Sequence, residues 1–502
     1  MSRTSLDAPG TATVSPLPSA SASPRHRWSI LAVIGVAQLM VVLDATIVNI
    51  ALPSAQQGLG FSDGDRQWVV TAYALAFGSL LLLGGRIADL FGRKMTFLVG
   101  LVGFAGASAL GGAAANFEML VTARAGQGLF GALLAPAAMS LLTTTFTDPK
   151  ERAKAFGVYG AIAGAGGAIG LLLGGVLTEH LDWRWTLYVN LVFAGVAFIG
   201  GALLLHGTPR DKTARLDIPG AILVGGGLFS LVYGFANAET HDWDSSQTWG
   251  WLTAGAVLLA AFTVWQTRSS HPLLPLRVLL DRNRSASFIA VLISGAGMFG
   301  VFLFLTYYLQ QSLGYTPLET GLAFLPMTGA LMVTSALATS VLLPRIGPKP
   351  VVPLGMGLAA VGMAWMTTFD LNSSYVTDIL PTLIVTGFGL GLVMPPAMAL
   401  ATAGVDAEHS GVASATVNAM QQVGGSIGTA LLNTLATGAA TDYLAGEDPR
   451  DPAVRAQAGL EAYSTAYWWS AVFFTVGLAI SVILYRRGVP EQDPDVAPVV
   501  HM

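Results

Sequence analysis

The chain has 502 residues, of which 53% are hydrophobic and 11% charged, and its mean hydropathy is +0.61. These values exclude an ordinary soluble domain and predict a polytopic helical membrane protein, since a spanning helix needs about 20 mostly apolar residues. The sequence has a net charge of −4, which says little about partners, and it has no cysteine, which excludes disulfides, thiolate metal sites and cysteine nucleophiles.

The chain begins with a segment rich in Ser, Ala and Pro that closes with Arg25-His26-Arg27. We expect residues 1–27 to be a disordered cytoplasmic tail. A cleaved signal peptide is the competing interpretation. The apolar stretch after Trp28 is long, contains Asp44 and shows no convincing small-x-small cleavage site, so we interpret it as the first spanning helix.

The apolar runs predict fourteen spanning helices with both termini on the cytoplasmic side. They are residues 28–52, 68–84, 95–114, 118–142, 153–177, 185–205, 218–236, 249–265, 287–309, 319–343, 351–369, 379–405, 411–436 and 466–485. Lys and Arg test this topology, because they concentrate in cytoplasmic loops. Of the 25 in the chain, 20 fall in loops and tails that would be cytoplasmic, four fall outside, and Arg124 lies inside a helix.

Three sequence echoes indicate an internal repeat. Residues 90–94, 126–129 and 166–170 are echoed by 345–349, 387–390 and 424–428, at offsets of 255, 261 and 258. The repeat predicts two six-helix halves around a site at the membrane midplane, which is the plan of a transporter. The expected parts are a tail (1–27), an N-terminal half (28–205), two linker helices with their loops (206–286), a C-terminal half (287–485) and a cytoplasmic tail (486–502).

The charge-dense residues 85–94 lie between two of the apolar runs. We expect a short loop at a membrane face whose charged side chains bond to each other or to the free backbone groups of a helix end. Such bonds form in one helix arrangement and break in another. We therefore predict a cytoplasmic latch, with a simple topological anchor as the alternative. Its residues are Gly85, Asp89, Gly92, Arg93 and Lys94.

Two charged residues lie well inside predicted helices, Asp44 in the first and Arg124 in the fourth. Charges inside the membrane are costly and indicate function. Burial favours the neutral form of a carboxyl and a nearby cation favours the carboxylate, so a carboxyl between the two influences can take up and release a proton. We predict that Asp44 is a proton site tuned by Arg124, which itself stays charged. A structural ion pair and direct binding of an anionic substrate by Arg124 are the alternatives.

The fifth helix is glycine-rich, which permits close helix contact and local bending. We predict a hinge or seal, with packing alone as the alternative; its glycines are Gly160, Gly164, Gly166, Gly170, Gly174 and Gly175. Polar side chains elsewhere are candidates to line a cavity, with interfacial or interhelical hydrogen bonding as the alternative. They are Gln38, Thr46, Asn49, Gln127, Tyr307, Gln311, Asn418 and Gln421.

Together these segments resemble the major facilitator superfamily, and within it the fourteen-spanner drug:proton antiporters, from about residue 28 to 485. Residues 85–94 resemble the superfamily's loop signature, and residues 43–53 resemble the first-helix motif of the fourteen-spanner group. Arg124 with residues 126–128 is similar to the fourth-helix motif, whose arginine the family links to proton coupling.

The resemblance extends to two further helices. Residues 157–175 are similar to the glycine-rich motif associated with antiporters, although Leu171 stands where that motif usually carries proline. Residues 411–425 match the thirteenth-helix pattern of these exporters. The tenth helix lacks the embedded carboxylate of some relatives that export divalent cations, which argues against dicationic substrates.

The resemblance implies a proton-coupled exporter of lipophilic drugs or antibiotics that works by alternating access in the inner membrane. We expect its partners to be a small lipophilic substrate, protons and the lipid bilayer, with no nucleic acid, and we expect a monomer. No cofactor or metal is expected, and the chain lacks the Gly-x-x-x-x-Gly-Lys-Ser/Thr pattern of an ATP site. A symporter or facilitator importing a nutrient is the first alternative. A membrane enzyme or sensor fits less well, because no acid–base cluster is found at a membrane face.

Overall fold

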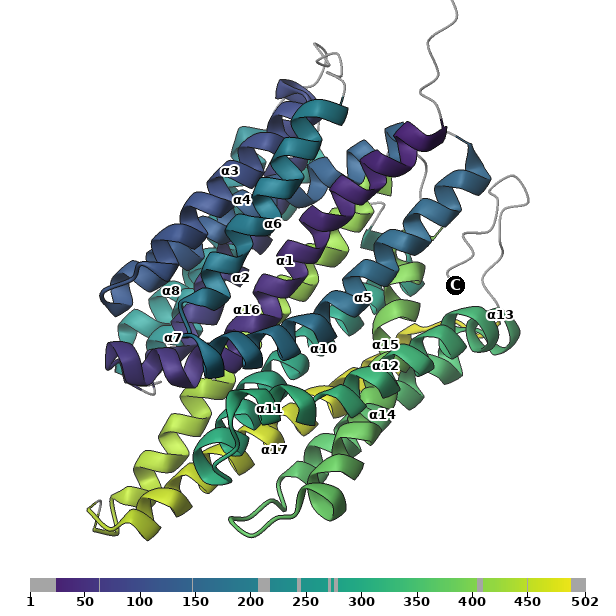
Figure 1. Cartoon of the computed structure of the whole chain (residues 1–502). Helices are drawn as coiled ribbons and strands as arrows, with labels where there is room; N and C mark the ends of the chain where they lie inside the picture. Colours follow the sequence, from purple (N-terminus) through teal and green to yellow (C-terminus); the bar gives the residue numbers. More distant parts are fainter. Residues whose placement is uncertain are drawn as a thin grey trace, which may run out of the picture.

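The computed structural model describes residues 24–62, 64–146, 148–205, 217–241, 245–269, 272–274, 279–403, 410–448 and 450–488, and its regular structure there is helical (Figure 1). The expected tails at residues 1–23 and 489–502 lie outside the described residues. So do parts of the linker region, including residues 206–216.

The first six helices form one bundle in which α1 packs on α5 and α6, and α4 packs on α2 and α3. They are α1 (Pro24–Leu59), α2 (Arg66–Phe91), α3 (Arg93–Gly112), α4 (Phe117–Thr145), α5 (Pro149–His180) and α6 (Trp185–Leu204). Each is long and mostly apolar, so burial of its apolar side chains against its neighbours and the membrane holds it in place.

Two helices, α7 (Ile218–His241) and α8 (Ser246–Arg268), pack on each other, and α7 also contacts α2 and α16. The remaining helices form a second bundle. They are α10 (Arg282–Tyr307), the π-helix η1 (Tyr308–Ser312), α11 (Pro317–Ala323), α12 (Leu325–Leu337), η2 (Ala338–Leu342), α13 (Leu343–Ile346), α14 (Pro348–Met366), η3 (Tyr375–Ile379), α15 (Leu380–Thr402), α16 (Ser410–Leu444) and α17 (Pro452–Leu484).

Within the described residues, eleven helical segments are long and apolar enough to cross a membrane. Three more long helices, α2, α5 and α16, run through the bundles beside them. The all-helical membrane fold is thereby confirmed, and these segments are consistent with fourteen crossings.

The first helix starts earlier than expected, at Pro24 rather than residue 28. Arg25, His26 and Arg27 therefore lie in its first turns instead of a tail. Arg27 forms an ion pair with Glu151 near the start of α5, with Arg27 Nη1 2.6 Å from Glu151 Oε2. The helix continues beyond its apolar part because this pair ties its charged end to a neighbouring helix.

The expected loop at residues 85–94 is wrong. The helix α2 continues to Phe91, α3 begins at Arg93, and only Gly92 separates them, with φ 93°. A glycine turns the chain in a single residue because it has no Cβ to clash at positive φ. Gly347, with φ 74°, separates α13 from α14 in the same way, so the internal repeat has a structural counterpart.

The two six-helix bundles meet mainly through α2 against α16 and through α5 against α11. Gly78 of α2 faces Gln422 of α16, and Gly175 of α5 faces Leu318 of α11. We call the end of the molecule at which α1 begins and α17 ends the proximal end, and the opposite end the distal end (Figure 1).

Candidate functional site

A polar network joins four helices inside the N-terminal bundle. Arg124 Nη1 donates to Asp44 Oδ2 at 2.6 Å and to Gln127 Oε1 at 2.8 Å. Gln127 Nε2 and Asn190 Nδ2 donate to Asp44 Oδ1 at 2.8 and 2.7 Å. Both amides also donate to Ser108 Oγ, at 2.8 and 3.3 Å. The Asp44 carboxylate thus accepts bonds from three separate side chains.

The network is closed to solvent. Asp44, Ser108, Gln127 and Asn190 are 0% exposed and Arg124 is 2% exposed. Burial of a charge is costly unless it is paired and hydrogen-bonded, and here each charge has the other as its partner. Removal of either partner would leave an uncompensated charge among the helices.

Arg124 also holds α2. Its Nε donates to the Val69 carbonyl at 3.0 Å, and its guanidinium carbon lies 4.5 Å from the centre of the Tyr73 ring. A cation over an aromatic face is attracted to it. Gly128, one turn further along α4, permits this approach, since a Cβ there would lie 2.3 Å from the Tyr73 carbonyl oxygen. The proton-site candidate and the position of α2 are therefore mechanically connected.

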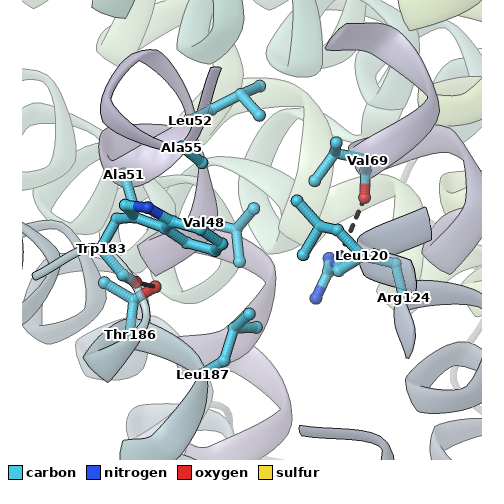
Figure 2. Close-up of a pocket in the computed structure, with 10 residues that line it drawn as sticks. All are labelled: Val48, Ala51, Leu52, Ala55, Val69, Leu120, Arg124, Trp183, Thr186 and Leu187. Atoms are coloured by element: carbon cyan, nitrogen blue, oxygen red, sulfur yellow. Dashed lines mark hydrogen bonds between the residues drawn. The ribbon is translucent and has the colours of Figure 1, made fainter. Parts of the chain in front are cut away.

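A small cavity adjoins Arg124 (Figure 2). Apolar side chains of α1, α2, α4 and the start of α6 line it, and it has room for about one water molecule. Its lining residues are Val48, Ala51, Leu52, Ala55, Val69, Leu120, Arg124, Trp183, Thr186 and Leu187. Figure 2 shows Arg124 beside Val69 and Leu120 at this cavity, with its hydrogen bond to the Val69 carbonyl.

The sequence predicted that Asp44 and Arg124 are partners, and in the structure they form an ion pair. It placed Gln127 in a cavity, whereas the structure places it in the network. It missed Ser108, Asn190 and Tyr73. A lone amide in the apolar run of α6 was the available signal for Asn190, and no comparable signal marked Ser108 in its Gly- and Ala-rich helix.

In the latch segment (residues 85–94), Lys94 has the clearest contacts. Its Nζ donates to the Ala202 carbonyl at 2.9 Å and to the Leu205 carbonyl at 2.5 Å. Ala202 lies in the last turn of α6 and Leu205 is its C-cap, and a cation is favoured at this end of a helix. Gly85 has room for a Cβ, whereas at the neighbouring Gly84 a Cβ would lie 2.0 Å from the Ala132 carbonyl oxygen. The side chain of Asp89 lies outside the described residues.

The glycines of α5 face two different partners. Gly166, Gly170 and Gly174 face Val42, Thr46 and Ile47 of α1, whereas Gly175 faces α11. In this structure they serve close packing along a continuous helix. Gly160 and Gly164 lie outside the residues whose side-chain surroundings are described.

The other candidate cavity residues do not gather at one place. Several are half-buried or buried within the bundles, and two lie near the distal end. In the N-terminal half, Gln38 accepts a hydrogen bond from Tyr159, Thr46 bonds within its own helix and Asn49 is buried. On α16, Asn418 and Gln421 are half-buried. Tyr307 donates a hydrogen bond to Gln56, and the exposed Gln311 accepts one from Tyr463.

Comparison with known proteins finds one matching family model and several similar chains. The family model described as Major Facilitator Superfamily matches residues 34–429. The puromycin resistance protein of Streptomyces alboniger is 50% identical over 91% of this chain and 90% of its own length. The cephamycin export protein of Amycolatopsis lactamdurans is 37% identical over 81% and 84%, and the tetracenomycin C resistance and export protein of Streptomyces glaucescens is 34% identical over 81% and 76%.

Solved structures share the fold at low sequence identity. A bacterial homologue of the human lysosomal transporter Spinster, inward-facing and unoccupied, aligns with a TM-score of 0.65 and 16% identity, over 92% of this chain and 97% of its own. An auto-inhibited peptide transporter of the POT family aligns at 0.67 and 17%, over 94% and 99%. These likenesses concern the arrangement of the helices.

Proposed function

The chain belongs to the major facilitator superfamily, whose members are transporters rather than enzymes, and we propose that it exports antibiotics or other lipophilic drugs in exchange for protons. Asp44 is the proton site and Arg124 its electrostatic partner. Transport proceeds by alternating access between the two six-helix halves, residues 28–205 and 287–485.

The observation that carries this proposal is the hydrogen bonding of Asp44. Its two oxygens accept N–H bonds from Arg124, Gln127 and Asn190. Two N–H donors occupy Oδ1 and one binds Oδ2, so a proton on Oδ1 must displace a donor, and a proton on either oxygen removes the negative charge that pairs with Arg124. Because these donors belong to α4 and α6 while Asp44 belongs to α1, protonation changes how three helices fit together.

The substrate class rests on the relatives. Resistance and export proteins for puromycin, cephamycin and tetracenomycin C are similar to most of this chain. Their names designate chemically different antibiotics, so we infer a related organic compound rather than one of these three in particular. Among the described residues, Asp44 is a carboxylate fully buried inside a spanning helix, and an apolar interior with such a group suits a lipophilic molecule that carries at most one positive charge.

We further propose that the proximal end faces the cytoplasm of a cell whose inner membrane holds the protein as a monomer. The distribution of Lys and Arg supports this orientation. In this scheme Gly85, Asp89, Gly92, Arg93 and Lys94 belong to the latch, and the α5 glycines allow α5 to move against α1 and α11.

The test uses everted membrane vesicles with an acid interior, reported by a pH-sensitive dye. Puromycin, a cephamycin, tetracenomycin C and a panel of lipophilic monocations are added in turn. The wild type is compared with Asp44→Asn and with Asp442→Asn, a matched substitution of an exposed carboxylate at the end of α16. We expect at least one compound to trigger proton release in the wild type and in Asp442→Asn, and none in Asp44→Asn.

Two results would contradict parts of the proposal. Proton release that survives in Asp44→Asn would keep antiport but remove Asp44 as the required proton site. Uptake of labelled compound into intact cells, driven by the proton gradient, would instead favour the importing symporter.

A further inference from the structure

Arg66, in the first turn of α2, is buried between the two halves. It is 4% exposed and lies at the distal end. Its guanidinium carbon is 4.5 Å from the centre of the Tyr307 ring and 5.4 Å from that of Phe304, both on α10. Its Nε donates to Asn433 Oδ1 of α16 at 2.8 Å. One arginine of the N-terminal half thus holds two helices of the C-terminal half.

Further bonds between the halves surround this arginine. Tyr307 donates its hydroxyl proton to Gln56 Oε1 at 2.6 Å, and Asn433 Nδ2 donates to the Gly64 carbonyl at 3.4 Å. Nearby, Gln310 Nε2 donates to the Ile50 carbonyl at 3.1 Å. The distal end is therefore closed by polar bonds that an outward opening must break.

The helix α2, which carries Arg66, also contacts Arg124, the partner of the proton-site candidate Asp44. Arg66, Val69 and Tyr73 are spaced i, i+3 and i+7, so they lie on one side of α2 within about 10 Å along its axis. Arg124 bonds to the Val69 carbonyl and stacks on Tyr73, while Arg66 bonds to the other half. Any shift of α2 that follows a change at Arg124 moves Arg66 against Tyr307 and Asn433.

We propose that Arg66 is a clamp that closes the distal end, and that α2 couples this clamp to the Asp44–Arg124 pair. The second part rests on the proposed function, because it assumes that Asp44 changes its protonation during transport. Arg66 is a positioning residue in this scheme, since it acts on the halves and not on the substrate or the proton.

The contacts of Arg66 set the size of the expected effect. A cation over an aromatic ring favours its bound arrangement by about two- to thirtyfold, and a hydrogen bond from a charged group does so by about tenfold or more. Loss of the clamp should therefore raise the ratio of distally open to distally closed molecules by about tenfold or more. The remaining bonds between the halves would still favour closure.

The first experiment measures this ratio without substrate or proton gradient. The sequence has no cysteine, so Gln57→Cys on α1 and Asp442→Cys on α16, both exposed near the distal end, can carry spin labels directly. The distance distribution is recorded in nanodiscs for the parent protein, Arg66→Gln and Arg184→Gln. Arg184 is the matched control, because it stacks on Trp183 at 4.4 Å within its own half.

We expect Arg66→Gln to populate a longer distance and Arg184→Gln to leave the distribution unchanged. Asn433→Ala tests the same contact from the other half and should lengthen the distance as well, which guards against misfolding of the arginine variant. An unchanged distribution in both folded variants would overturn the clamp.

The second experiment tests the coupling through α2. Arg66→Gln is measured alone and combined with Asp44→Asn, and the open-to-closed ratios are compared as a double-mutant cycle. We expect the effect of Arg66→Gln to differ by at least about threefold between the two backgrounds. Equal effects would overturn the coupling while leaving the clamp in place. Neither result depends on whether Asp44→Asn abolishes proton release, so failure of the proposed function would be seen separately.

Discussion

Gly170 of α5 lies directly against Thr46 of α1, because a Cβ on Gly170 would be only 2.0 Å from Thr46 Oγ1 and 3.2 Å from Thr46 Cβ. Thr46 cannot readily turn away, since its hydroxyl donates to the carbonyls of Val42 and Leu43 in its own helix. The separation of α1 and α5 at this point therefore depends on the absence of a side chain on α5.

Gly170→Ala should force the two helices apart. We expect it to lower the thermal unfolding temperature and to reduce drug-driven proton release at least several-fold. Gly167→Ala is the matched control on the same helix, because no atom lies within 4 Å of its added Cβ. Alanine favours a helix over glycine by about 1 kcal/mol, so this control should be unchanged or slightly more stable. Equal behaviour of the two variants would refute the packing argument.

Lys94 offers a second test, at the proximal end. Its ammonium group donates to the Ala202 and Leu205 carbonyls at the end of α6, and such a contact contributes about 1 kcal/mol. Lys94→Met should lower stability by about that amount, measured by thermal unfolding in detergent. Lys349→Met, at the equivalent position of the repeat, is the control and should have less effect. If Lys94 is also part of a moving latch, transport will fall by more than the loss of stability accounts for.

The positions of charged residues in the sequence predicted the membrane fold and the buried pair Asp44–Arg124. Hydropathy and the distribution of Lys and Arg predicted the helical membrane fold, because lipid excludes charges from all but a few positions. The same exclusion made Asp44 and Arg124 conspicuous, and the structure places them in contact. The sequence echo around Gly92 and Gly347 indicated an internal repeat, and in the structure both glycines have a positive φ between two helices.

What the sequence could not predict depends on contacts between distant segments. Residues 85–91 continue α2 because a helix can extend beyond the apolar layer, and hydropathy does not report that extension. Ser108 and Asn190 are ordinary polar residues until the fold brings them to Asp44. Arg66 falls in the outer loop between the predicted spans 28–52 and 68–84, yet it is buried because Tyr307 and Asn433 of the other half cover it.

Asn190 provides a test of the network that does not remove a charge. Its amide donates to Asp44 Oδ1 and Ser108 Oγ, and all three residues are fully buried. Asn190→Leu removes one of three donors to the carboxylate, which should cost about 1–3 kcal/mol of stability. It should also reduce proton release per drug molecule transported, measured in the same vesicles. An unchanged number of protons released per drug molecule in a folded Asn190→Leu protein would show that the bonds from Arg124 and Gln127 to Asp44 are enough for proton coupling.

The last prediction concerns Asp217, which caps α7 just outside the membrane-spanning segment. Its Oδ1 accepts from the Gly220 backbone N–H at 3.0 Å and from Trp265 Nε1 at 2.7 Å, and its Oδ2 accepts from Gln266 Nε2 at 2.8 Å. Burial alone would raise the pKa of this carboxyl, but these hydrogen bonds favour the carboxylate and hold its pKa below the ordinary value of 3.8. Gln266 in turn accepts the backbone N–H of Leu274 at 2.9 Å, so the carboxylate fixes the proximal ends of both linker helices.

The sign of the pH effect follows from that lowered pKa. A carboxyl with a lower pKa in the folded state stabilises the fold above its unfolded pKa, and it loses this contribution as the pH falls through the folded value. We therefore expect faster amide hydrogen exchange at Gly220, Leu273 and Leu274 as the pH falls below about 4, after correction for the intrinsic exchange rate. Asp217→Asn should show the faster exchange already at pH 7 and little further change. Ser245→Ala removes the neutral cap of α8, and its effect on exchange at the start of that helix should not depend on pH in this range, since Ser245 Oγ accepts from the Gln247 backbone N–H without a charge. A wild-type protein whose exchange at these residues is the same at pH 3 and pH 7 would show that the carboxylate does not hold the linker pair in place.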